Sequence, residues 1–244
     1  MSLKSRAIQI LFKNVIIRRA ITTVVRKAGF DLIRGLQAPA ALLRYFDINL
    51  IIDVGANEGQ FGKWVRGIGY TGRIVSIEPV STAYNALQRS IAHDPKWTAM
   101  RLAIGREEGF LKIHVAENSV YSSALPRAQF LVESDDSSTY IRSEMVEQRT
   151  IDGILDSVSN IGDRILLKID TQGFEREVLA GAVSSLPKLT GVLLELSFLA
   201  LYEGEPLSKE MIETLGGYGF SLVSLQPLMY GNLCQGDGMF FRVK

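Results

Sequence analysis

Short apolar segments alternate with longer amphipathic segments from about residue 47 to the end of the chain. Apolar runs without alternation are typical of strands that are buried on both faces of a parallel sheet. They predict strands at 50–54, 73–77, 99–104, 164–169, 190–196, 219–225 and 238–243. The amphipathic segments predict helices at 58–68, 81–91, 174–185 and 207–217. This alternation indicates one doubly wound α/β domain with a mostly parallel sheet.

Three segments depart from this alternation. Residues 111–115 predict an extra strand that pairs antiparallel with the segment before it, across a turn between Gly105 and Gly109. Residues 117–140 are rich in Ser, Glu and Asp and predict a mobile loop near the site. The last two predicted strands are joined by a connection too short for a crossover helix, so they pair antiparallel or join separate sheets.

Charge divides the chain into two parts. Residues 1–45 hold nine of the 27 basic residues but only one of the 26 acidic residues, so this segment is strongly basic and the remainder is acidic. Apolar residues within it recur at roughly helical spacing. We therefore expect a basic helical extension over residues 1–46 and a single domain over residues 47–244.

The basic extension has two interpretations. A basic amphipathic helix can lie on an anionic membrane, in which case residues 1–28 would hold the protein at the inner membrane surface. Alternatively, the helix packs on the domain with its basic face in water. The segment lacks an apolar run of ~18 residues, so we do not expect it to span a membrane. Its one early aromatic residue, Phe12, offers little base stacking, so no nucleic-acid partner is expected.

The composition limits the kind of site. The chain is 47% apolar, which is enough for a substantial core. Cys234 is the single cysteine, and the two histidines, His93 and His114, lie far apart in sequence. We therefore expect neither a disulfide nor a metal site built on cysteine or histidine. We expect a cytoplasmic location.

A glycine-rich turn follows the first predicted strand. That strand carries Asp53 near its end, and Gly55, Asn57 and Gly59 come directly after it. Glycines allow a tight turn and close backbone approach to a ligand, and the free N–H groups of the next helix face the same ligand. The following strand ends at Glu78, where a carboxylate can accept hydrogen bonds from ribose hydroxyls. The pattern predicts a crevice that binds adenosine.

The spacing of the turn narrows the choice of cofactor. Dinucleotides are bound by G-x-G-x-x-G, whereas this chain has G-x-N-x-G after an acid. An acid disfavours a pyrophosphate but suits an α-amino group, which Asp53 or the loop carbonyls could hold, and so indicates S-adenosylmethionine. The simpler alternative is that Asp53 only caps the turn. A terminal antiparallel strand supports the same cofactor, because it distinguishes the common methyltransferase fold from NAD-binding domains.

Several blocks of sequence resemble the FkbM family of S-adenosylmethionine-dependent methyltransferases. They are Ile52–Phe61, Ile77–Pro79, Leu102–Gly105, Arg149–Asp152, Leu167–Glu175, Val178–Ala182 and Leu193–Glu195. The resemblance covers roughly residues 49–200, so it leaves out the basic extension. It implies the class I methyltransferase fold and O-methylation, often of a sugar or polyketide hydroxyl. One departure stands out: Gln172 occupies a position where the family usually has an acid.

Two sets of candidate residues follow. The cofactor-binding candidates are Asp53, Gly55, Ala56, Asn57, Gly59, Phe61, Glu78, Pro79, Ala103, Ser123 and Asp170. The catalytic candidates are Asp170, Glu175 and Lys168. Asp170 follows a strand, where ligands bind in an open α/β sheet, so it either accepts the hydroxyl proton or holds the methionine part of the cofactor.

Simpler interpretations exist for each catalytic candidate. Asp170 and Glu175 both lie where an acid stabilises the start of a helix. Lys168 shares a sheet face with Asp170, and either pairs with it or reaches solvent. Glu195 lies in an apolar strand, where an acid is costly unless it is paired, and its pairing is either functional or structural.

These observations predict an S-adenosylmethionine-dependent O-methyltransferase that acts on a sugar, glycolipid or polyketide-type acceptor. Two alternatives remain open. A non-catalytic scaffold that binds the nucleotide is kept open by Gln172. A nicotinamide-dependent oxidoreductase is disfavoured by the missing third glycine. The acceptor cannot be chosen from sequence, because variable loops build acceptor pockets.

Overall fold

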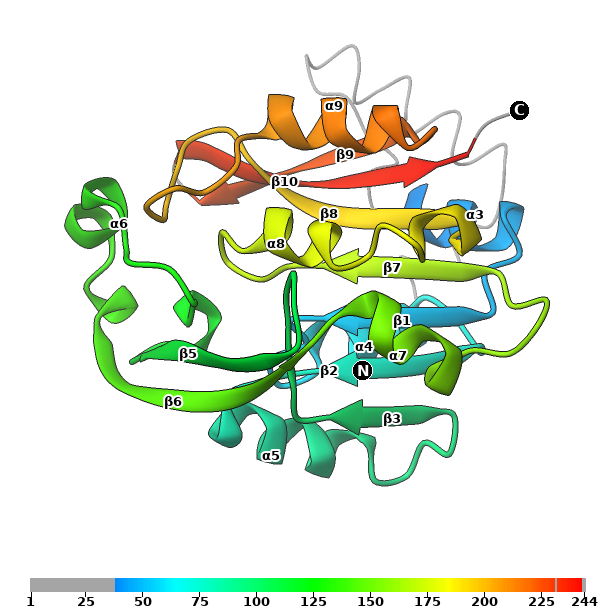
Figure 1. Cartoon of the computed structure of the whole chain (residues 1–244), viewed down its shortest axis with the longest axis horizontal. Coiled ribbons are helices and arrows are strands. Elements are labelled where there is room, and N and C mark those ends of the chain that lie inside the picture. The colour runs from blue at the N-terminus through cyan, green and yellow to red at the C-terminus, as the bar shows by residue number, and fades with distance from the viewer. Residues whose placement is uncertain (1–37, 231, 243–244) are drawn as a thin grey trace, which may run out of the picture. The chain divides into compact units, whose positions relative to one another are not determined.

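The computed structural model describes residues 38–230 and 232–242 (Figure 1). The predicted basic segment therefore lies almost entirely outside the described residues, and its membrane and packing interpretations both stay predictions. The last part of the predicted helical extension is seen as α3 (Ala38–Tyr45). No helix within the described ranges is long and apolar enough to cross a membrane.

A seven-stranded sheet forms the centre of the domain (Figure 1). Its strand order is β3-β2-β1-β7-β8-β10-β9. The five strands from β3 to β8 pair in parallel, whereas β10 pairs antiparallel with both β8 and β9. Their bounds are β1 (Leu50–Val54), β2 (Arg73–Ile77), β3 (Trp97–Met100), β7 (Ile165–Ile169), β8 (Gly191–Ser197), β9 (Ser221–Tyr230) and β10 (Asn232–Phe241). The predicted doubly wound sheet with a C-terminal antiparallel strand, the class I methyltransferase arrangement, is confirmed.

Helices cover both faces of the sheet. One hydrophobic core packs α7 (Ile151–Val158), α8 (Glu175–Ala180) and α9 (Ser208–Gly217) against one face. The other packs α3, α4 (Gln60–Gly67) and α5 (Ser81–Ile91) against the opposite face. Strands β1 and β7 are buried along their whole length, which explains why their sequences are apolar without alternation. The two cores fix the carboxyl ends of the parallel strands in space.

A second, three-stranded sheet lies beside these carboxyl ends (Figure 1). It has the order β4-β6-β5, with β4 (Ala103–Ile104), β5 (Gly109–Ala116) and β6 (Tyr140–Arg149). The predicted extra strand is real, but the prediction of its partner is wrong. β5 pairs antiparallel with β6 and not with the segment before it, because the intervening loop folds back and brings β6 alongside.

The segment between β5 and β6 is more ordered than the sequence predicts. It contains two single turns of 3-10 helix, η1 (Ser119–Tyr121) and η2 (Asp136–Ser138), and the short helix α6 (Gln129–Ser134). Side-chain hydrogen bonds within the segment hold it: Tyr121 donates to Asp135 at 2.7 Å, and the Asp135 carboxylate caps η2. The segment therefore has a defined structure and is not an irregular loop.

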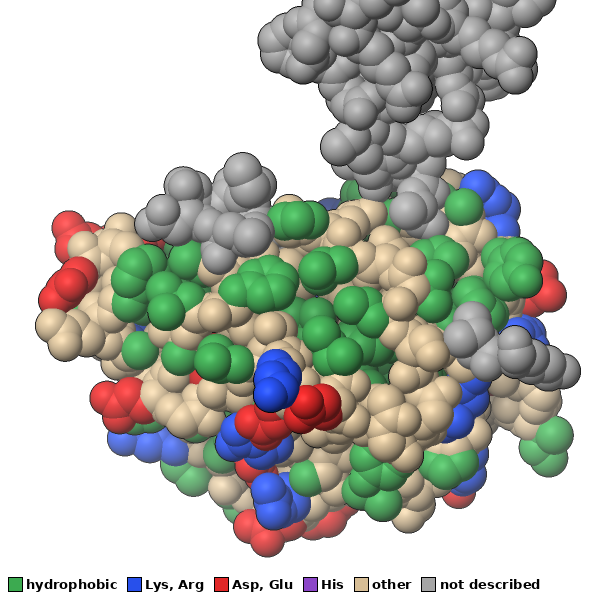
Figure 2. All heavy atoms as spheres, turned by 90° about the horizontal axis from the view of Figure 1, so that it is seen from above, with side chains coloured by type: hydrophobic (Ala, Val, Ile, Leu, Met, Phe, Trp, Pro, Cys, Tyr) green, Lys and Arg blue, Asp and Glu red, His purple; other side chains and the backbone are tan. Residues whose placement is uncertain are grey.

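Strand β9 forms one edge of the large sheet. It carries three partly exposed apolar residues, Leu222, Val223 and Leu225. Figure 2 looks down on this side of the domain and shows hydrophobic side chains gathered there. Pro227 lies within the same strand and pairs with Gly236 of β10; an edge strand is where a sheet tolerates proline.

Candidate active site at the carboxyl edge of the sheet

Five polar or small residues form one row across the large sheet. The strand pairing places the last residues of β1, β2 and β7 beside one residue in the middle of β8. The residues that come next along these four strands, together with the β10 residue that pairs with the one on β8, therefore form one row. In strand order the row is Glu78, Gly55, Asp170, Glu195 and Asp237. Residues from distant parts of the chain meet there because parallel strands present their carboxyl ends at one edge.

A cavity of about 650 Å³ lies over this row. Its walls come from the turn after β1, the loop after β7, the second sheet, the segment between β5 and β6, and strand β10. This volume falls within the range of small-molecule sites, which runs from roughly 300 to 1,000 Å³. The cavity is mostly apolar, with a few polar groups that converge from the row, as is typical of a ligand site.

The turn after β1 adopts left-handed backbone at Gly55 (φ 74°), Asn57 (φ 45°) and Gly59 (φ 85°). A Cβ atom on Gly55 would lie 1.7 Å from the carbonyl oxygen of Asp170. Gly55 is therefore required because two loops meet there. Gly59 does not line the cavity, and a side chain on it would meet Leu87 of α5. The two predicted glycines thus serve packing at least as much as ligand approach.

Glu78 projects from the end of β2 into the cavity and is 5% exposed. Its two carboxylate oxygens accept the N–H groups of Asn57 and Val80, each at 2.8 Å. These bonds hold the carboxylate in one orientation beside the turn. Burial nevertheless raises the pKa of Glu78 to about 7, because the cost of desolvating the charge outweighs the two bonds.

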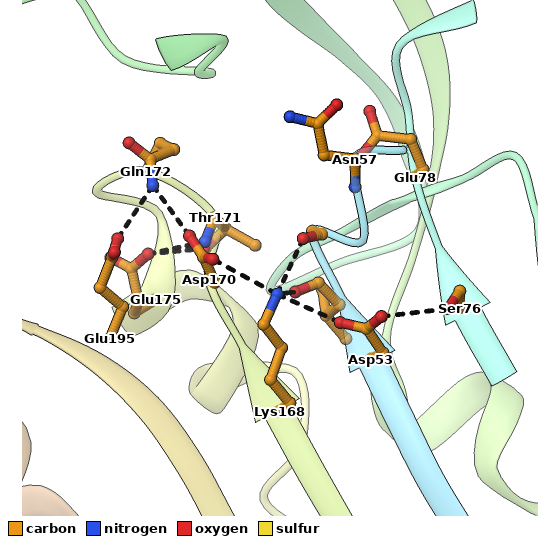
Figure 3. Close-up of polar contacts among 12 residues, drawn as sticks. Asp53, Asn57, Ser76, Glu78, Lys168, Asp170, Thr171, Gln172, Glu175 and Glu195 are labelled. Atoms are coloured by element: carbon orange, nitrogen blue, oxygen red, sulfur yellow. Dashed lines mark hydrogen bonds and ion pairs between the residues drawn. The ribbon is translucent and has the colours of Figure 1, made fainter. Parts of the chain in front are cut away.

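Asp53 lies beneath the cavity and not in its wall (Figure 3). Its carboxylate is fully buried, lies 3.1 Å from the ammonium of Lys168 and accepts a hydrogen bond from Ser76 at 3.0 Å. The predicted contact between Asp53 and the cofactor's amino group finds no geometric support, because the pairing turns the carboxylate toward Lys168. The structure assigns Asp53 the task of holding that ammonium.

Lys168 connects this buried layer to the cavity. Its ammonium also lies 3.4 Å from Asp170 and donates to the carbonyl oxygen of Gly55 at 2.8 Å. The pKa of Lys168 is raised above its usual range, since the attraction of Asp170 and Asp53 exceeds the cost of burial. Lys168 therefore stays charged. The alternative in which it reaches solvent is wrong, because the side chain is 5% exposed.

Gln172 ties together the acids of the row (Figure 3). Its amide nitrogen donates to Asp170 at 2.8 Å and to Glu195 at 2.9 Å, and its amide oxygen accepts the hydroxyl of Tyr202 at 2.9 Å. Gln172 itself has left-handed backbone, with φ of 55°. A neutral donor at this position lets two carboxyl groups lie close together, which a third acid would oppose.

Glu175 does not line the cavity. Its carboxylate is 3% exposed and accepts the N–H groups of Thr171 and Gly173 at 2.8 and 3.3 Å. Burial raises the pKa of Glu175 to about 7. Because it touches the loop that carries Asp170 and Gln172 and not the cavity, Glu175 is a positioning residue in this geometry.

Most of the predicted candidates meet at the cavity. Those that line it are Gly55, Ala56, Asn57, Phe61, Glu78, Pro79, Ala103, Ser123, Lys168 and Asp170. Asp53, Gly59 and Glu175 lie behind the wall. Ser123 contributes a hydroxyl that donates to the carbonyl of Gln172 at 2.6 Å, so it joins the segment between β5 and β6 to the loop after β7.

Sequence reasoning missed the parts of the wall that come from the segment between β5 and β6 and from β10. Ser119, Phe130, Gln235 and Asp237 line the cavity but were not candidates. Ser119 donates to the side chain of Asn57 at 3.0 Å, so the segment between β5 and β6 touches the glycine-rich turn. No local pattern marks these residues, and Asp237 lies one residue before the strand predicted at 238–243.

The arrangement suits a reaction on a hydroxyl group. Asp170 lies at the centre of the row. The ammonium of Lys168 lies beside it, and the amide nitrogen of Gln172 donates a hydrogen bond to it. A carboxylate so placed can accept a proton. Within the described residues there is no group of three or more His, Cys, Asp or Glu side chains that could hold a metal ion.

Comparison of the sequence with models of protein families finds one match. A family model described as "Methyltransferase FkbM domain" matches residues 53–222 of the 244, which is more than half of the chain. No curated protein matches the chain.

Solved structures resemble the chain only distantly. An rRNA methylase from Streptococcus thermophilus is 10% identical with a TM-score of 0.48, over 88% of this chain and 100% of that one. Fibrillarin from Aeropyrum pernix, solved with bound S-adenosyl-L-methionine, is 12% identical with a TM-score of 0.48, over 84% and 75%. Magnesium protoporphyrin IX methyltransferase from Synechocystis is 11% identical with a TM-score of 0.46, over 85% and 79%. These likenesses are too remote to bear on the chemistry of this chain.

Proposed function

Because the chain belongs to the FkbM methyltransferase family, we propose that it transfers a methyl group to a hydroxyl of a small-molecule or glycan acceptor. The observation that carries the proposal is the row at the carboxyl edge of the sheet. Glu78, to which we assign the ribose, and Asp170, to which we assign the hydroxyl proton, both belong to this row and line one cavity. The methyl donor of this methyltransferase is S-adenosyl-L-methionine.

The residues beside the turn fit this donor. Glu78 is oriented by two backbone N–H groups and keeps lone pairs for hydroxyl hydrogens, which suits a ribose. The apolar end of the cavity beside it is built from Leu102, Ala103 and Ile104, which suits a flat adenine ring. When bound, S-adenosylmethionine supplies an electrophilic methyl group, and the transfer forms an O–C bond, breaks an S–C bond and leaves a neutral thioether.

The chain's own residues then have three tasks. The first is alignment, because a displacement in line requires the acceptor oxygen to be held at a fixed angle and distance. The second is removal of the hydroxyl proton, which Asp170 accepts as the new bond forms. The third is to hold the Asp170 carboxylate in one position, which Lys168 does through an ion pair and Gln172 through a hydrogen bond.

Calorimetric titration with S-adenosylmethionine tests the donor site. We expect micromolar binding by the wild type and binding at least tenfold weaker by Glu78→Ala, because the variant loses the ribose partner. Glu58→Ala is a matched control, since this neighbouring glutamate is exposed and does not line the cavity. Saturable binding of NAD without binding of S-adenosylmethionine would favour the oxidoreductase alternative and overturn the proposal.

Transfer itself is tested separately. Donor labelled in the methyl group is incubated with hydroxyl-bearing acceptors, and the wild type is compared with Asp170→Asn. We expect label in an acid-stable ether, with a rate that falls by roughly 10²- to 10⁴-fold in the variant because its amide cannot accept the proton. Donor binding with no transfer to any acceptor class would favour the scaffold alternative.

A further inference from the structure

We propose that the β8–β10 end of the cavity binds an unphosphorylated acceptor that carries a protonated amine beside the reacting hydroxyl, as in an amino sugar. This inference rests on the proposed function and goes beyond it by naming the charge of the acceptor. It is carried by the order of the side chains along the row and by the balance of charge around the cavity.

The order of the row leaves one end free for a second molecule. Glu78 on β2 marks the donor end, and Asp170 on β7 marks the centre. Glu195 on β8 and Asp237 on β10 lie beyond the centre and pair directly with each other in the register. Neighbouring strands are about 4.8 Å apart, so the row from β2 to β10 spans roughly 19 Å. That length accommodates a donor and an acceptor placed end to end.

Acidic side chains outnumber basic side chains in the wall of the cavity. Five carboxyl groups line it: Glu78, Asp135, Asp170, Glu195 and Asp237. Among the described residues that line it, Lys168 is the one cation, and its ammonium is already bound to Asp53 and Asp170. A phosphate or carboxylate on the acceptor would face these acids with no free positive charge to meet it.

Asp237 is the acid that lacks a partner. No hydrogen bond or ion pair joins its side chain to another residue in the described ranges, although it is only partly exposed. Glu195 beside it accepts hydrogen bonds from Gln172 and Gln235, both at 2.9 Å and both on the same oxygen. The Asp237 carboxylate is therefore left to receive hydrogens from a ligand. An ammonium supplies three such hydrogens together with the missing charge.

The proton affinities agree with this charge balance. Burial and the nearby Asp170 raise the pKa of Asp237 to about 6. Burial and the neighbouring acids Asp170, Glu175 and Asp237 raise the pKa of Glu195 well above its usual range. In both groups burial is the largest cause and the nearby acids add to it, so a charged carboxylate here is costly without a cation beside it. A bound ammonium would offset that cost.

The remaining walls suit a ring. Tyr121, Phe130 and Leu201 line the cavity beside these acids and offer apolar or aromatic surface. Aromatic faces pack against the C–H faces of sugar rings while the acids bind the polar edge. The amine is protected from methylation while it is bound, because its lone pair carries the proton that pairs with Asp237. The methyl group is then directed to a hydroxyl near Asp170.

Three matched sugars test the inference. They are glucosamine, which carries the ammonium, N-acetylglucosamine, which has lost the charge, and glucosamine 6-phosphate, which adds a phosphate. Their dissociation constants are measured by saturation-transfer NMR on the full chain saturated with S-adenosylhomocysteine. We expect glucosamine to bind at least fivefold more tightly than either of the other two. Equal binding, the reverse order, no binding by any sugar, or binding that appears only with added Mg²⁺ would overturn the inference.

Variants show whether the acids at this end are responsible. Asp237→Asn keeps the shape and removes the charge, so the glucosamine dissociation constant should rise at least fivefold toward that of N-acetylglucosamine. Glu213→Gln removes the same charge from an exposed position on α9 that does not line the cavity and should leave binding unchanged. An unchanged preference in Asp237→Asn would overturn the assignment.

Donor binding separates the two proposals. Both variants should bind S-adenosylhomocysteine as the wild type does, which also shows that they are folded. Failure of the wild type to bind S-adenosylhomocysteine would count against the proposed function. Normal donor binding without the preference for glucosamine would count against the acceptor inference alone.

Discussion

The ammonium of Lys168 lies 3.1 Å from the carboxylate of Asp53, and neither side chain is more than 5% exposed. This buried pair lies directly under the row that lines the cavity and connects to it through Asp170. Burying two charges costs desolvation energy, so this ion pair contributes mainly by holding neighbouring groups in position. Here it fixes the loops after β1 and β7 against each other.

Replacing Lys168 by Met should destabilise the fold by about 3–5 kcal/mol, because Asp53 is left as an unpaired buried charge. The free energy of unfolding from urea titration measures this effect. The double variant Asp53→Asn with Lys168→Met should recover a large part of the loss, since neither charge remains. A loss below about 1 kcal/mol in the single variant would show that water reaches Asp53.

Donor affinity should depend on pH through Glu78. Its pKa is raised to about 7 by burial, so the carboxylate gains a proton as the pH falls below 7 and loses part of its capacity to accept ribose hydroxyls. Calorimetry with S-adenosylhomocysteine should show affinity at pH 5.5 about tenfold or more below that at pH 8. Glu78→Gln should bind weakly with a flat profile. Parallel profiles in the two proteins would contradict this role.

The stability of the fold should depend on pH through Glu175. Its pKa is raised from 4.5 to about 7 in the folded protein, so the folded state binds the proton more tightly than the unfolded state. This contribution is fully present below pH 4.5 and is lost as the pH rises through 7. The shift corresponds to roughly 3 kcal/mol.

Glu175→Gln removes that dependence. The variant should match the wild type near pH 5 and exceed its free energy of unfolding by about 1–3 kcal/mol at pH 8, because it pays no cost for burying a charge. Urea titrations at the two pH values measure the difference. A constant difference between the two proteins would mean that Glu175 does not titrate in this range.

Gln172→Glu should destabilise the protein, although an acid is the family's usual residue there. The change replaces a donor by an acceptor between Asp170 and Glu195, so it removes two hydrogen bonds and adds a third negative charge. We expect a loss of about 1–3 kcal/mol at pH 8 that shrinks at pH 5. Gln172→Met removes the same bonds without adding a charge, so its loss should change less with pH than that of Gln172→Glu.

The central strands of the large sheet could be predicted because each has an apolar sequence pattern of its own. Strands β1 and β2 lie where the sequence predicts them, since each is a β-branched run that is buried on both faces. The ends of β10 were not predictable in the same way. This strand begins at Asn232, and its first half includes Gln235, Gly236 and Asp237, which have no apolar pattern. Pairing with β8 and β9 makes that half a strand.

The same contrast explains the second sheet and the candidate site. Strand β6 is polar, with Arg142, Glu144 and Glu147 along it, and is formed by its pairing with β5. In the site, Glu78 and Asp170 follow from their positions at strand ends. Asp53 was assigned to the cofactor because it lies beside the glycines in sequence, but its partner Lys168 comes from a strand 115 residues later. Such contacts become visible only in three dimensions.

The antiparallel placement of β10 has a consequence for how acceptor preference can change. In the proposed acceptor end, Asp237 lies on β10, whereas Glu195 lies on β8 and Tyr121 and Phe130 lie in the segment between β5 and β6. The β9–β10 hairpin joins the rest of the sheet only through β8, at the edge farthest from Glu78. Exchange of the hairpin between members of the family would therefore replace one acid of the proposed acceptor end and leave the residues proposed to bind the donor in place.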